Sequence, residues 1–379
     1  METKAKLFAR NLRAKRRAAG LTQDALGEMI SYSGKSVSKW ESGEAYPPAE
    51  LLPDIAKILN SDIDSFFDYK EAPKYFLGID GGGTKCDYLL VDSEGHVLKS
   101  HQGGAANPLS VGPRVAFENM KSGITNACEG YPYGQISVYA GLAAGSDAQV
   151  KSMVVQFLNE FGFACCDCGS DAQNSIAAGL KGEDGVAVIM GTGSTAFSSL
   201  NGVSKRYGGY GHLVADHGSG FTYGRAVISS VLSHKDGSGR PTVMTEILQK
   251  KAGKEPILLI PDIYEGGKQY IASFAPIIFE AYKMGDAVAI EAVETNVRLL
   301  SNIIRAALRD FDGLERDVPV VLCGGLCAHA SVIVPIMERN LRDSRYSEIR
   351  IMTEKPVHGA VINARKVFDD LIKEHNESN

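Results

Sequence analysis

The sequence predicts an all-α N-terminal domain of five helices, followed by an α/β region that is built from two similar lobes. Apolar residues recur with helical spacing up to about residue 67, and the polar stretch 68–74 (DYKEAPK) then separates this region from the rest. Beyond that stretch, two segments that begin at residues 75 and 186 repeat one pattern of short apolar strand, glycine-containing turn and returning strand. A hairpin that occurs twice, each time at the head of a long segment, favours two lobes of one architecture.

Length and composition are those of a globular protein with several domains. The 379 residues suggest two or three domains, and 44% are hydrophobic. No apolar run approaches the roughly 18 residues that a membrane helix needs, and the basic start lacks the apolar segment of a signal peptide. We therefore expect a cytoplasmic protein with no membrane partner. The seven cysteines do not have the spacing of a metal site, so reduced thiols are expected.

Capping residues place the first helices. A first helix over residues 6–19 is ended by Gly20, and Thr22 caps a second helix. Three residues of that second helix are expected to face inward: Ala25, Leu26 and Met29. Ser33 starts a third helix, and two short helices joined by such a tight turn make a helix-turn-helix. Residues 47–59 and 63–67 supply the fourth and fifth helices.

The segments LTQDALGEMI, SVSKWESGEAYP, LLPDIAKILN and DIDSFF resemble the XRE (Cro and phage-repressor) DNA-binding family over about 65 residues. The resemblance implies that residues 1–69 bind a DNA operator as part of a homodimer, with Gln23 on a phosphate. It places the third helix in the major groove, with these residues nearest the DNA: Gly34, Lys35, Ser36, Ser38 and Lys39. Seven Lys or Arg among residues 1–20 fit a nucleic-acid partner. A helical interaction module without DNA binding is the alternative.

The stretch 75–91 (YFLGIDGGGTKCDYLLV) is a hairpin whose turn suits a phosphate. Glycines allow main-chain N–H groups to approach an anion, a hydroxyl adds a donor and a lysine adds positive charge. The residues concerned are Gly81, Gly82, Gly83, Thr84 and Lys85. Asp80 at the strand end suits a water-coordinated Mg²⁺, because this cation prefers carboxylate and water oxygens. A tight structural turn is the alternative interpretation.

A second such segment, VAVIMGTGSTAFSSL, begins at residue 186. With it, residues 75–365 resemble the actin-like ATPase superfamily, which has a duplicated RNase H-like fold, and more narrowly the BadF/BadG/BcrA/BcrD family that contains N-acetylglucosamine kinase. The resemblance implies ATP and Mg²⁺ as cofactors and a sugar as substrate. The domains expected are 1–69, a linker 70–74, lobe I at 75–182 with a C-terminal helix at about 358–375, and lobe II at 183–357.

The resemblance also implies roles for further motifs. In MGTGST, the residues Gly191, Thr192 and Gly193 hold the β- and γ-phosphates, and in VVLCGGLCAHAS the residues Gly324 and Gly325 lie where the adenosine binds. In GSDAQNSIAAG, Asp171 is the catalytic base. A sugar hydroxyl needs a proton acceptor as it attacks the γ-phosphate, and a carboxylate at a strand end is suited to that task. The alternative is that Asp171 only caps the helix that follows.

For the sugar, the resemblance nominates Asn107, in GAANP, and Asp216, in GGYGHLVADHGSG. An Asn before a proline is otherwise a turn residue. Two positions depart from the family pattern: His217 stands where the family has glutamate, and Thr195 stands where N-acetylglucosamine kinase has asparagine. Both touch the expected sugar pocket, so the identity of the sugar stays open.

These observations define three hypotheses. The first is an ATP-dependent amino-sugar kinase fused to a DNA-binding domain, and the second is a sugar or nucleotide sensor with little turnover that regulates transcription. The third is an ATPase activator of a dehydratase, which is disfavoured by the DNA-binding segment and the sugar-type segments. Repressors of the ROK type carry the zinc motif CxCGxxGC, which is absent from this sequence.

Overall fold

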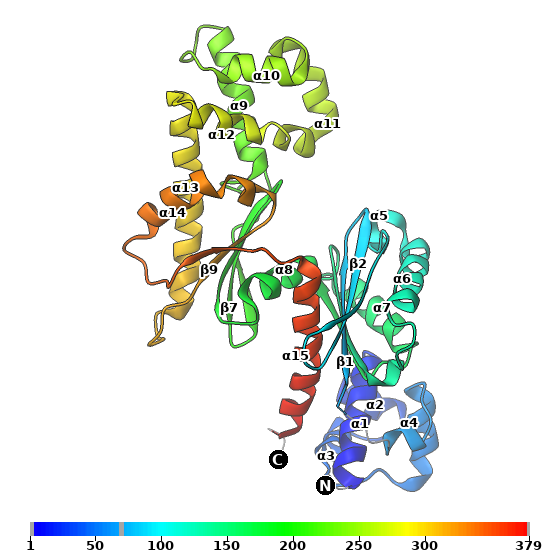
Figure 1. Ribbon diagram of the computed structural model, residues 1–379. Helices are drawn as coiled ribbons and strands as arrows, with labels where there is room; N and C mark the ends of the chain where they lie inside the picture. The colour runs from blue at the N-terminus through cyan, green and yellow to red at the C-terminus, as the bar shows by residue number, and fades with distance from the viewer. Residues whose placement is uncertain (1–3, 68–71, 377–379) are drawn as a thin grey trace. The chain divides into compact units, whose positions relative to one another are not determined.

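The computed structural model describes residues 4–67 and 72–376 (Figure 1). The predicted boundary at residues 69 and 70, and residues 70 and 71 of the predicted linker, lie outside the described residues. By internal contacts the chain divides into two compact units, residues 1–174 with 356–379 and residues 175–355.

The N-terminal region is helical, as predicted. Its α-helices are α1 (Lys4–Ala18), α2 (Gln23–Met29), α3 (Gly34–Ser42) and α4 (Leu52–Ile58). The fifth predicted helix is a single 3₁₀ turn, η2 (Asp64–Phe66), and a second such turn, η1 (Ala49–Leu51), precedes α4. Five residues between polar turns leave room for only about one turn of helix, so an isolated α-helix does not form there.

A small apolar core holds these helices together. Phe8, Leu26, Val37 and Trp40 are among its buried members, and the burial of Leu26 agrees with the helical spacing of α2. The side chains of Thr22 and Ser33 accept the backbone N–H groups of Ala25 and Ser36 and so cap α2 and α3. The prediction that Met29 faces inward is wrong, because its side chain is 58% exposed and Ile30 is buried instead.

The first unit contains a five-stranded sheet in the order β3-β2-β1-β4-β5. Its strands are β1 (Tyr75–Gly81), β2 (Lys85–Asp92), β3 (Val97–Gly104), β4 (Ile136–Leu142) and β5 (Cys165–Ser170). The first three pair antiparallel, and β1, β4 and β5 pair in parallel. Its helices are α5 (Pro108–Val111), α6 (Pro113–Ala127), α7 (Ala148–Asn159) and α15 (Pro356–Asn376).

Successive side chains of β1 point to opposite faces of this sheet, and both faces are packed. Leu77 and Ile79 pack in one core with Met120 of α6 and Val154 of α7, whereas Phe76 packs with residues of α15. Figure 1 shows α15 on the opposite side of the sheet from α6 and α7. The sheet is therefore covered by helices on both faces, and the loops at the ends of its strands remain available for a site.

The second unit repeats this architecture. Its sheet has the order β10-β9-β6-β7-β8, from β6 (Gly185–Met190), β7 (Ser194–Leu200), β8 (Val203–Tyr207), β9 (Val320–Cys323) and β10 (Ile349–Ile351). Again the first three strands in sequence pair antiparallel and the last two join in parallel. The duplication predicted from the two hairpins is thus confirmed at the level of strand order and direction.

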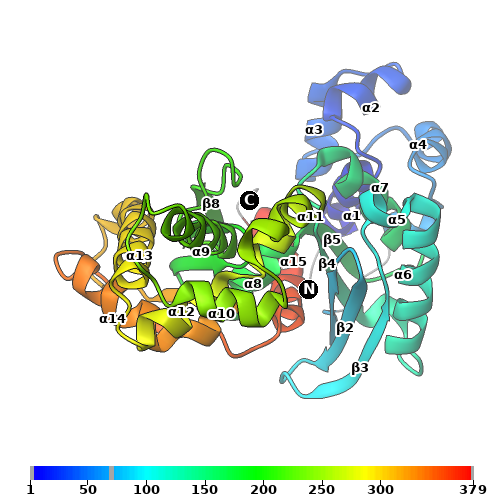
Figure 2. The same ribbon diagram turned by 90° about the horizontal axis from the view of Figure 1, so that it is seen from above.

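The second sheet is accompanied by more α-helices than the first sheet. They are α9 (Gly220–Lys235), α10 (Met244–Ala252), α11 (Ile260–Ala272), α12 (Ala275–Lys283), α13 (Ala287–Leu308) and α14 (Ala330–Leu341). Helices α9, α12 and α13 lie side by side (Figure 2), and their apolar residues form one large core with β6 and β9.

Helix α8 (Asp171–Leu180) spans the division between the units. Asn174 is buried in the first unit, whereas Ile176 and Leu180 pack on Ala187 and Val321 of the second sheet. Helix α15 follows the last strand of the second unit but packs on the first sheet, where the Ala364 carbonyl accepts the Ser137 hydroxyl at 2.6 Å.

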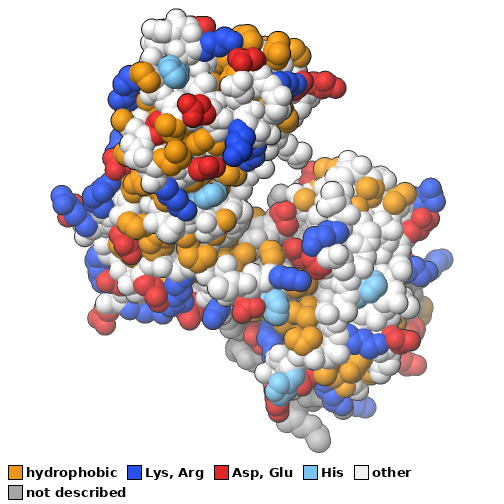
Figure 3. All heavy atoms as spheres, turned by 45° about the horizontal axis from the view of Figure 1, so that its top comes forward, with side chains coloured by type: hydrophobic (Ala, Val, Ile, Leu, Met, Phe, Trp, Pro, Cys, Tyr) orange, Lys and Arg blue, Asp and Glu red, His pale blue; other side chains and the backbone are white. Residues whose placement is uncertain are grey.

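The surface carries charges of both signs. On the face drawn in Figure 3, acidic and basic side chains are interspersed with apolar ones rather than gathered into one field of a single sign. No helix in the described ranges, 4–67 and 72–376, is long and apolar enough to cross a membrane.

Candidate active site

The first glycine turn joins β1 to β2. The Gly82 N–H donates to the Lys85 carbonyl at 2.9 Å, and the Gly82 carbonyl accepts from Ala106 N–H at 3.3 Å. None of Gly81, Gly82 and Gly83 has a φ in the left-handed region, so unusual backbone angles do not explain the three glycines. Close packing explains the first, because a Cβ on Gly81 would lie 2.3 Å from Leu142 Cδ2.

The exposed corner of this turn consists of Gly83, Thr84 and Lys85. The ammonium group of Lys85 lies 3.3 Å from Asp87 Oδ2, but the lysine side chain is more than half exposed and free to turn. The corner can therefore present main-chain N–H groups, a hydroxyl and a cation to an anion, as predicted from the sequence.

Asp80 is held at the end of β1 by an asparagine that the sequence analysis did not single out. Asn174 Nδ2 donates to Asp80 Oδ1 at 2.8 Å and also to the carbonyls of Ile79 and Gly141, at 3.2 and 3.4 Å. The amide oxygen of Asn174 is buried without a partner among the described residues. Asn174 therefore fixes the carboxylate of Asp80 from the side of α8.

The charge of Asp80 is poorly compensated. Burial is the main cause that raises the pKa of Asp80 to about 6; the negative charges of Asp171 and Asp87 raise it further, while Asn174 and Lys85 act in the opposite direction. A divalent cation would supply the missing positive charge. In the part of the chain that the structure describes, no three acidic, His or Cys side chains converge as a metal cage.

Asp171 is the first residue of α8 and is exposed. Its Oδ1 accepts the backbone N–H of the next residue, Ala172, at 2.8 Å. The N-cap of α8 is Ser170 instead: its hydroxyl accepts the Gln173 N–H at 3.3 Å, and the Gln173 side chain accepts the Ser170 N–H at 2.8 Å. The second carboxylate oxygen of Asp171, Oδ2, accepts no hydrogen bond from the described residues and stays available to a ligand. Since Ser170 caps the helix, the Asp171 carboxylate is not needed for that task, which is compatible with a role as base.

Asn107 caps the short helix α5. Its Oδ1 accepts the Leu109 N–H at 3.0 Å, and the residue is 9% exposed. The amide oxygen of Asn107 therefore stabilises the turn, as the alternative interpretation expects. The amide N–H₂ group is left as a donor for a ligand hydroxyl.

The second glycine turn joins β6 to β7, and its carbonyls point toward α9. The carbonyls of Gly191 and Thr192 accept the N–H groups of Gly220 and Phe221 at 2.8 and 3.1 Å. The N–H groups of Thr192 and Gly193 have no hydrogen-bond partner in the described ranges of the chain. Two free donors on a glycine turn are suited to phosphate oxygens.

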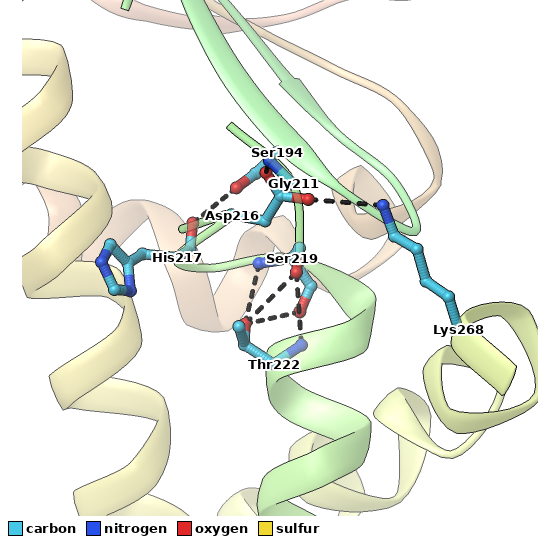
Figure 4. Close-up of polar contacts among 7 residues, drawn as sticks. All are labelled: Ser194, Gly211, Asp216, His217, Ser219, Thr222 and Lys268. Carbon is cyan, nitrogen blue, oxygen red and sulfur yellow. Dashed lines mark hydrogen bonds and ion pairs between the residues drawn. The ribbon is translucent and has the colours of Figure 1, made fainter. Parts of the chain in front are cut away.

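The loop before α9 brings Asp216 to this turn (Figure 4). Asp216 is 3% exposed and has a φ of 65°, an unusual backbone conformation for a residue other than glycine. Its Oδ1 accepts the Gly211 N–H at 3.2 Å, and its Oδ2 lies 3.3 Å from the ammonium group of Lys268 on α11. A Cβ on Gly193 would lie 2.8 Å from Asp216 Oδ2, so this turn and the carboxylate are in contact.

The start of α9 is rigid. Ser219 and Thr222 exchange hydrogen bonds between side chain and backbone in a capping box, at 3.2 and 3.0 Å. The neighbouring hydroxyl of Ser194 donates to the His217 carbonyl at 2.7 Å. These contacts hold the loop on which Asp216 lies (Figure 4).

The two positions that depart from the family pattern lie beside this loop. Thr195 donates to the Tyr207 carbonyl at 3.3 Å and packs against Gly209, where a Cβ would lie 2.7 Å from the threonine side chain. His217 is half-buried next to Asp216. The structure therefore keeps both residues in the neighbourhood of the predicted sugar contact.

Gly324 and Gly325 follow β9, directly beside the end of β6. Gly324 has a φ of 99°, and a Cβ there would lie 2.5 Å from the Met190 carbonyl oxygen. Only glycine satisfies both conditions. Gly325 begins the 3₁₀ turn η6 (Gly325–His329), and a Cβ there would meet nothing within 4 Å.

The N-terminal domain presents the predicted DNA-contacting residues on α3. Lys35, Ser38 and Lys39 are exposed, Gly34 and Ser36 are partly exposed, and Val37 and Trp40 are buried on the opposite side. Gly34 packs closely on α2, since a Cβ would lie 1.8 Å from Asp24 Oδ1. Gln23 donates to Glu41 Oε2 at 2.8 Å, so its side chain is already oriented, and its second amide hydrogen is left for a phosphate.

The structure thus gathers the predicted residues into two groups. Asp80 and Asp171 lie with the first glycine turn in one unit, and Asp216 lies with the second glycine turn in the other. Sequence reasoning missed Asn174 and Lys268. Asn174 lay inside a motif that was already recognised, and the pair Gly266-Gly267 directly before Lys268 was a signal that the helix is interrupted there.

Two α/β units of one topology, each with a glycine turn beside a carboxylate, are the architecture of the actin-like ATPase fold predicted from the sequence. The profile of the BadF/BadG/BcrA/BcrD ATPase family matches residues 77–364, and the chain belongs to this family. A helix-turn-helix profile matches residues 12–66. The family, the fold and the helix-turn-helix region predicted from the sequence are confirmed.

Curated relatives cover the same part of the chain. An N-acetyl-D-glucosamine kinase of Dictyostelium discoideum is 29% identical over 313 residues, which are 76% of this chain and 97% of the relative. An N-acetylmuramic acid/N-acetylglucosamine kinase of Clostridium acetobutylicum is 29% identical over 308 residues, 78% of this chain and 100% of the relative.

A solved structure shares the fold. The crystal structure of a proposed N-acetylglucosamine kinase from Chromobacterium violaceum superimposes with a TM-score of 0.58 at 23% identity and covers 78% of this chain and 100% of its own.

Proposed function

We propose that the protein is an ATP-dependent kinase of an amino sugar, N-acetylglucosamine or a close relative, and that its N-terminal domain makes it a sugar-responsive regulator of transcription. One observation carries the proposal: in each unit, a glycine turn with exposed donors lies beside a carboxylate. The choice of substrate is supported by the two curated relatives, which are matched over nearly their whole length and are named as kinases of N-acetylglucosamine.

ATP is bound through both glycine turns in this proposal. Gly81, Gly82, Gly83, Thr84 and Lys85 form one group of phosphate contacts, and Gly191, Thr192 and Gly193 form the other. The free N–H groups of Thr192 and Gly193 are suited to the oxygens of the terminal phosphates. Gly324 and Gly325 are proposed to lie beside the adenosine: Gly324 lets the chain turn closely against the end of β6, and Gly325, where a Cβ would meet nothing within 4 Å, leaves room for the ligand.

Asp171 is the proposed base. A sugar hydroxyl attacks the γ-phosphorus, the new O–P bond forms as the bond to the β-phosphate oxygen breaks, and the hydroxyl proton passes to the Asp171 carboxylate. ADP leaves with the negative charge of the broken bond. Asn107, Thr195 and Asp216 orient the sugar, with the buried Asp216 accepting hydrogen bonds from ring hydroxyls.

Asp80 is the residue proposed to hold Mg²⁺, through a water molecule. The cation would neutralise charge that develops on the phosphate oxygens. Asn174 keeps the Asp80 carboxylate oriented for this contact, because its amide donates to Oδ1.

The N-terminal domain is proposed to bind an operator as a homodimer, because one domain of this kind reads a single half-site. Gln23 contacts a phosphate, and α3 presents Gly34, Lys35, Ser36, Ser38 and Lys39 to the DNA. Since ATP and DNA are both proposed ligands, we place the protein in the cytoplasm.

A sugar-dependent ADP assay tests the enzymatic part. With Mg²⁺ and ATP, the full chain should release ADP when one amino sugar of a panel is added. Asp171→Asn should lower this rate by about a hundredfold or more, the usual contribution of a general base, while ATP binding persists. Asp369→Asn, which neutralises an exposed carboxylate on α15, serves as the matched control. A panel without any sugar-dependent ADP would overturn the kinase.

A further inference from the structure

Among the described residues, Lys268 is the one cationic side chain that contacts the buried Asp216. Helix α11 is broken at Gly267, where φ is 55° and ψ is −143°, so the chain changes direction immediately before this lysine. This combination of φ and ψ is accessible to glycine and strained for other residues, so Gly267 permits the break in α11. The lysine side chain extends from α11 to the Asp216 carboxylate (Figure 4).

The ammonium group of Lys268 lies close to the second glycine turn as well as to Asp216. A Cβ on Gly193 would lie 3.0 Å from Lys268 Nζ and 2.8 Å from Asp216 Oδ2. Both charged atoms are therefore in contact range of the backbone whose N–H groups are free. A phosphate that accepted those N–H groups would lie next to the ammonium group.

Lys268 also has hydrogen-bond donors that Asp216 does not use. The Asp216 carboxylate receives one N–H, from Gly211, and one contact from Lys268. An ammonium group has three hydrogens, and Asp216 uses one of them. The lysine side chain is 33% exposed whereas the aspartate side chain is 4% exposed, so Lys268 is the member of the pair that a ligand can reach from solvent.

Electrostatics explains why a cation is needed at this point. A buried carboxylate beside the second glycine turn would repel the terminal phosphate of a nucleotide if it were alone. An ammonium group that contacts both anions removes this repulsion. Lysine suits such a shared contact because it is a compact charge with rotatable donors.

We propose that Lys268 binds the terminal phosphate of ATP while it holds the Asp216 carboxylate, and so joins the phosphate donor to the sugar contact. This inference rests on the proposed kinase function and adds a residue to it. Since the cation acts at the third phosphate, Lys268 should distinguish ATP from ADP.

Nucleotide binding tests the inference without turnover. The dissociation constants of ATP and of ADP, both with Mg²⁺, are measured by titration calorimetry on the full chain without sugar. Their ratio is compared among the wild type, Lys268→Met, Lys268→Arg and the control Lys251→Met, which removes an exposed cation from α10. A change in the folded fraction affects both constants alike, so the ratio is insensitive to partial unfolding.

In Lys268→Met, the preference for ATP over ADP should fall about tenfold, the size expected for one charge-assisted hydrogen bond. Lys268→Arg should keep most of the preference, and Lys251→Met should keep all of it. A fall of less than about threefold in Lys268→Met would overturn the inference, even if the wild type shows sugar-dependent ADP release. A wild type that binds no ATP would instead overturn the kinase proposal itself.

Discussion

Among single residues, Asp80 shows how burial and nearby charges act together. Its pKa is raised to about 6, mainly by burial and then by the charges of Asp171 and Asp87. A folded-state pKa above the ordinary value of 3.8 means that the folded protein binds the proton more tightly than the unfolded chain does. The free energy of unfolding therefore falls as the pH rises between about 4 and 6, when neither nucleotide nor cation is bound.

Asp80→Asn should remove this pH dependence. At pH 7 the variant should be more stable than the wild type by about 1–3 kcal/mol, the upper value corresponding to the full pKa shift. The amide oxygen that the substitution introduces can still accept from Asn174. Below about pH 4 the two proteins should be equally stable. Urea unfolding of the nucleotide-free protein at pH 4 and 7 measures the difference.

The exposed Asp369→Asn provides the comparison for Asp80→Asn, because it removes one carboxylate without removing a buried charge. If Asp80→Asn changed stability equally at both pH values, the raised pKa would not be the cause.

Gly193 is a second residue whose role depends on its surroundings. In Gly193→Ala the new methyl group would lie 2.8 Å from Asp216 Oδ2 and 3.0 Å from Lys268 Nζ, so the turn or the carboxylate must move. We expect the KM for ATP to rise about tenfold or more, because displaced donors lose a charge-assisted contact.

Gly313→Ala is the matched control, since a Cβ at this exposed position of the same unit meets nothing within 4 Å. Steady-state kinetics with a saturating sugar measures both variants. Equal KM values for ATP in Gly193→Ala and Gly313→Ala would show that the turn does not contact the phosphates.

At the scale of elements, α1 and α3 are joined through one buried ion pair. Arg16 donates through Nε and Nη2 to both carboxylate oxygens of Glu41, at 2.6 and 2.9 Å, and Gln23 adds a third donor. A bidentate pair satisfied in this way fixes the orientation of the elements that carry it. The exposed face of α3 is therefore held in a defined direction relative to α1 and α2.

Removal of the two lysines on that face should weaken DNA binding of any sequence. In Lys35→Ala with Lys39→Ala, affinity for a random duplex should fall, and the slope of log affinity against log salt should decrease by about two. Fluorescence anisotropy over a range of salt concentrations measures both quantities.

Lys57→Ala, at the exposed end of α4, removes one cation from the same domain while leaving α3 intact. If its salt slope fell as much as that of the α3 double variant, DNA would not be bound through α3.

At the scale of the whole molecule, the fusion of a DNA-binding region with a sugar kinase fold predicts coupling between two kinds of ligand. We expect the affinity for operator DNA to change by about fivefold or more when the sugar is added, the lower end of typical allosteric coupling. Gel shifts with and without the sugar measure this change once an operator has been selected.

Asp216→Asn should bind the operator normally without ligand and should no longer respond to the sugar. DNA affinity that is the same with and without sugar would remove the regulatory part of the proposal and leave the kinase part standing.

Local patterns were sufficient to predict much of this architecture. The strand-glycine turn-strand pattern at residues 75 and 186 predicted two lobes, and the two sheets have the same strand order. Capping residues such as Thr22 and Ser33 predicted where helices begin. These features depend on neighbours in sequence, which is why they could be predicted without a structure.

Other features depend on contacts between distant residues. Met29 is exposed because Ile30 fills the core, and Gln23 is engaged by a carboxylate that lies 18 residues further along the chain. Asn174 holds Asp80 across 94 residues, and Lys268 reaches Asp216 across 52. The residue pattern was enough to establish the family, the duplicated fold and the glycine turns. Which side chain supports each carboxylate depended on the folded arrangement, because charge and burial act through space rather than along the chain.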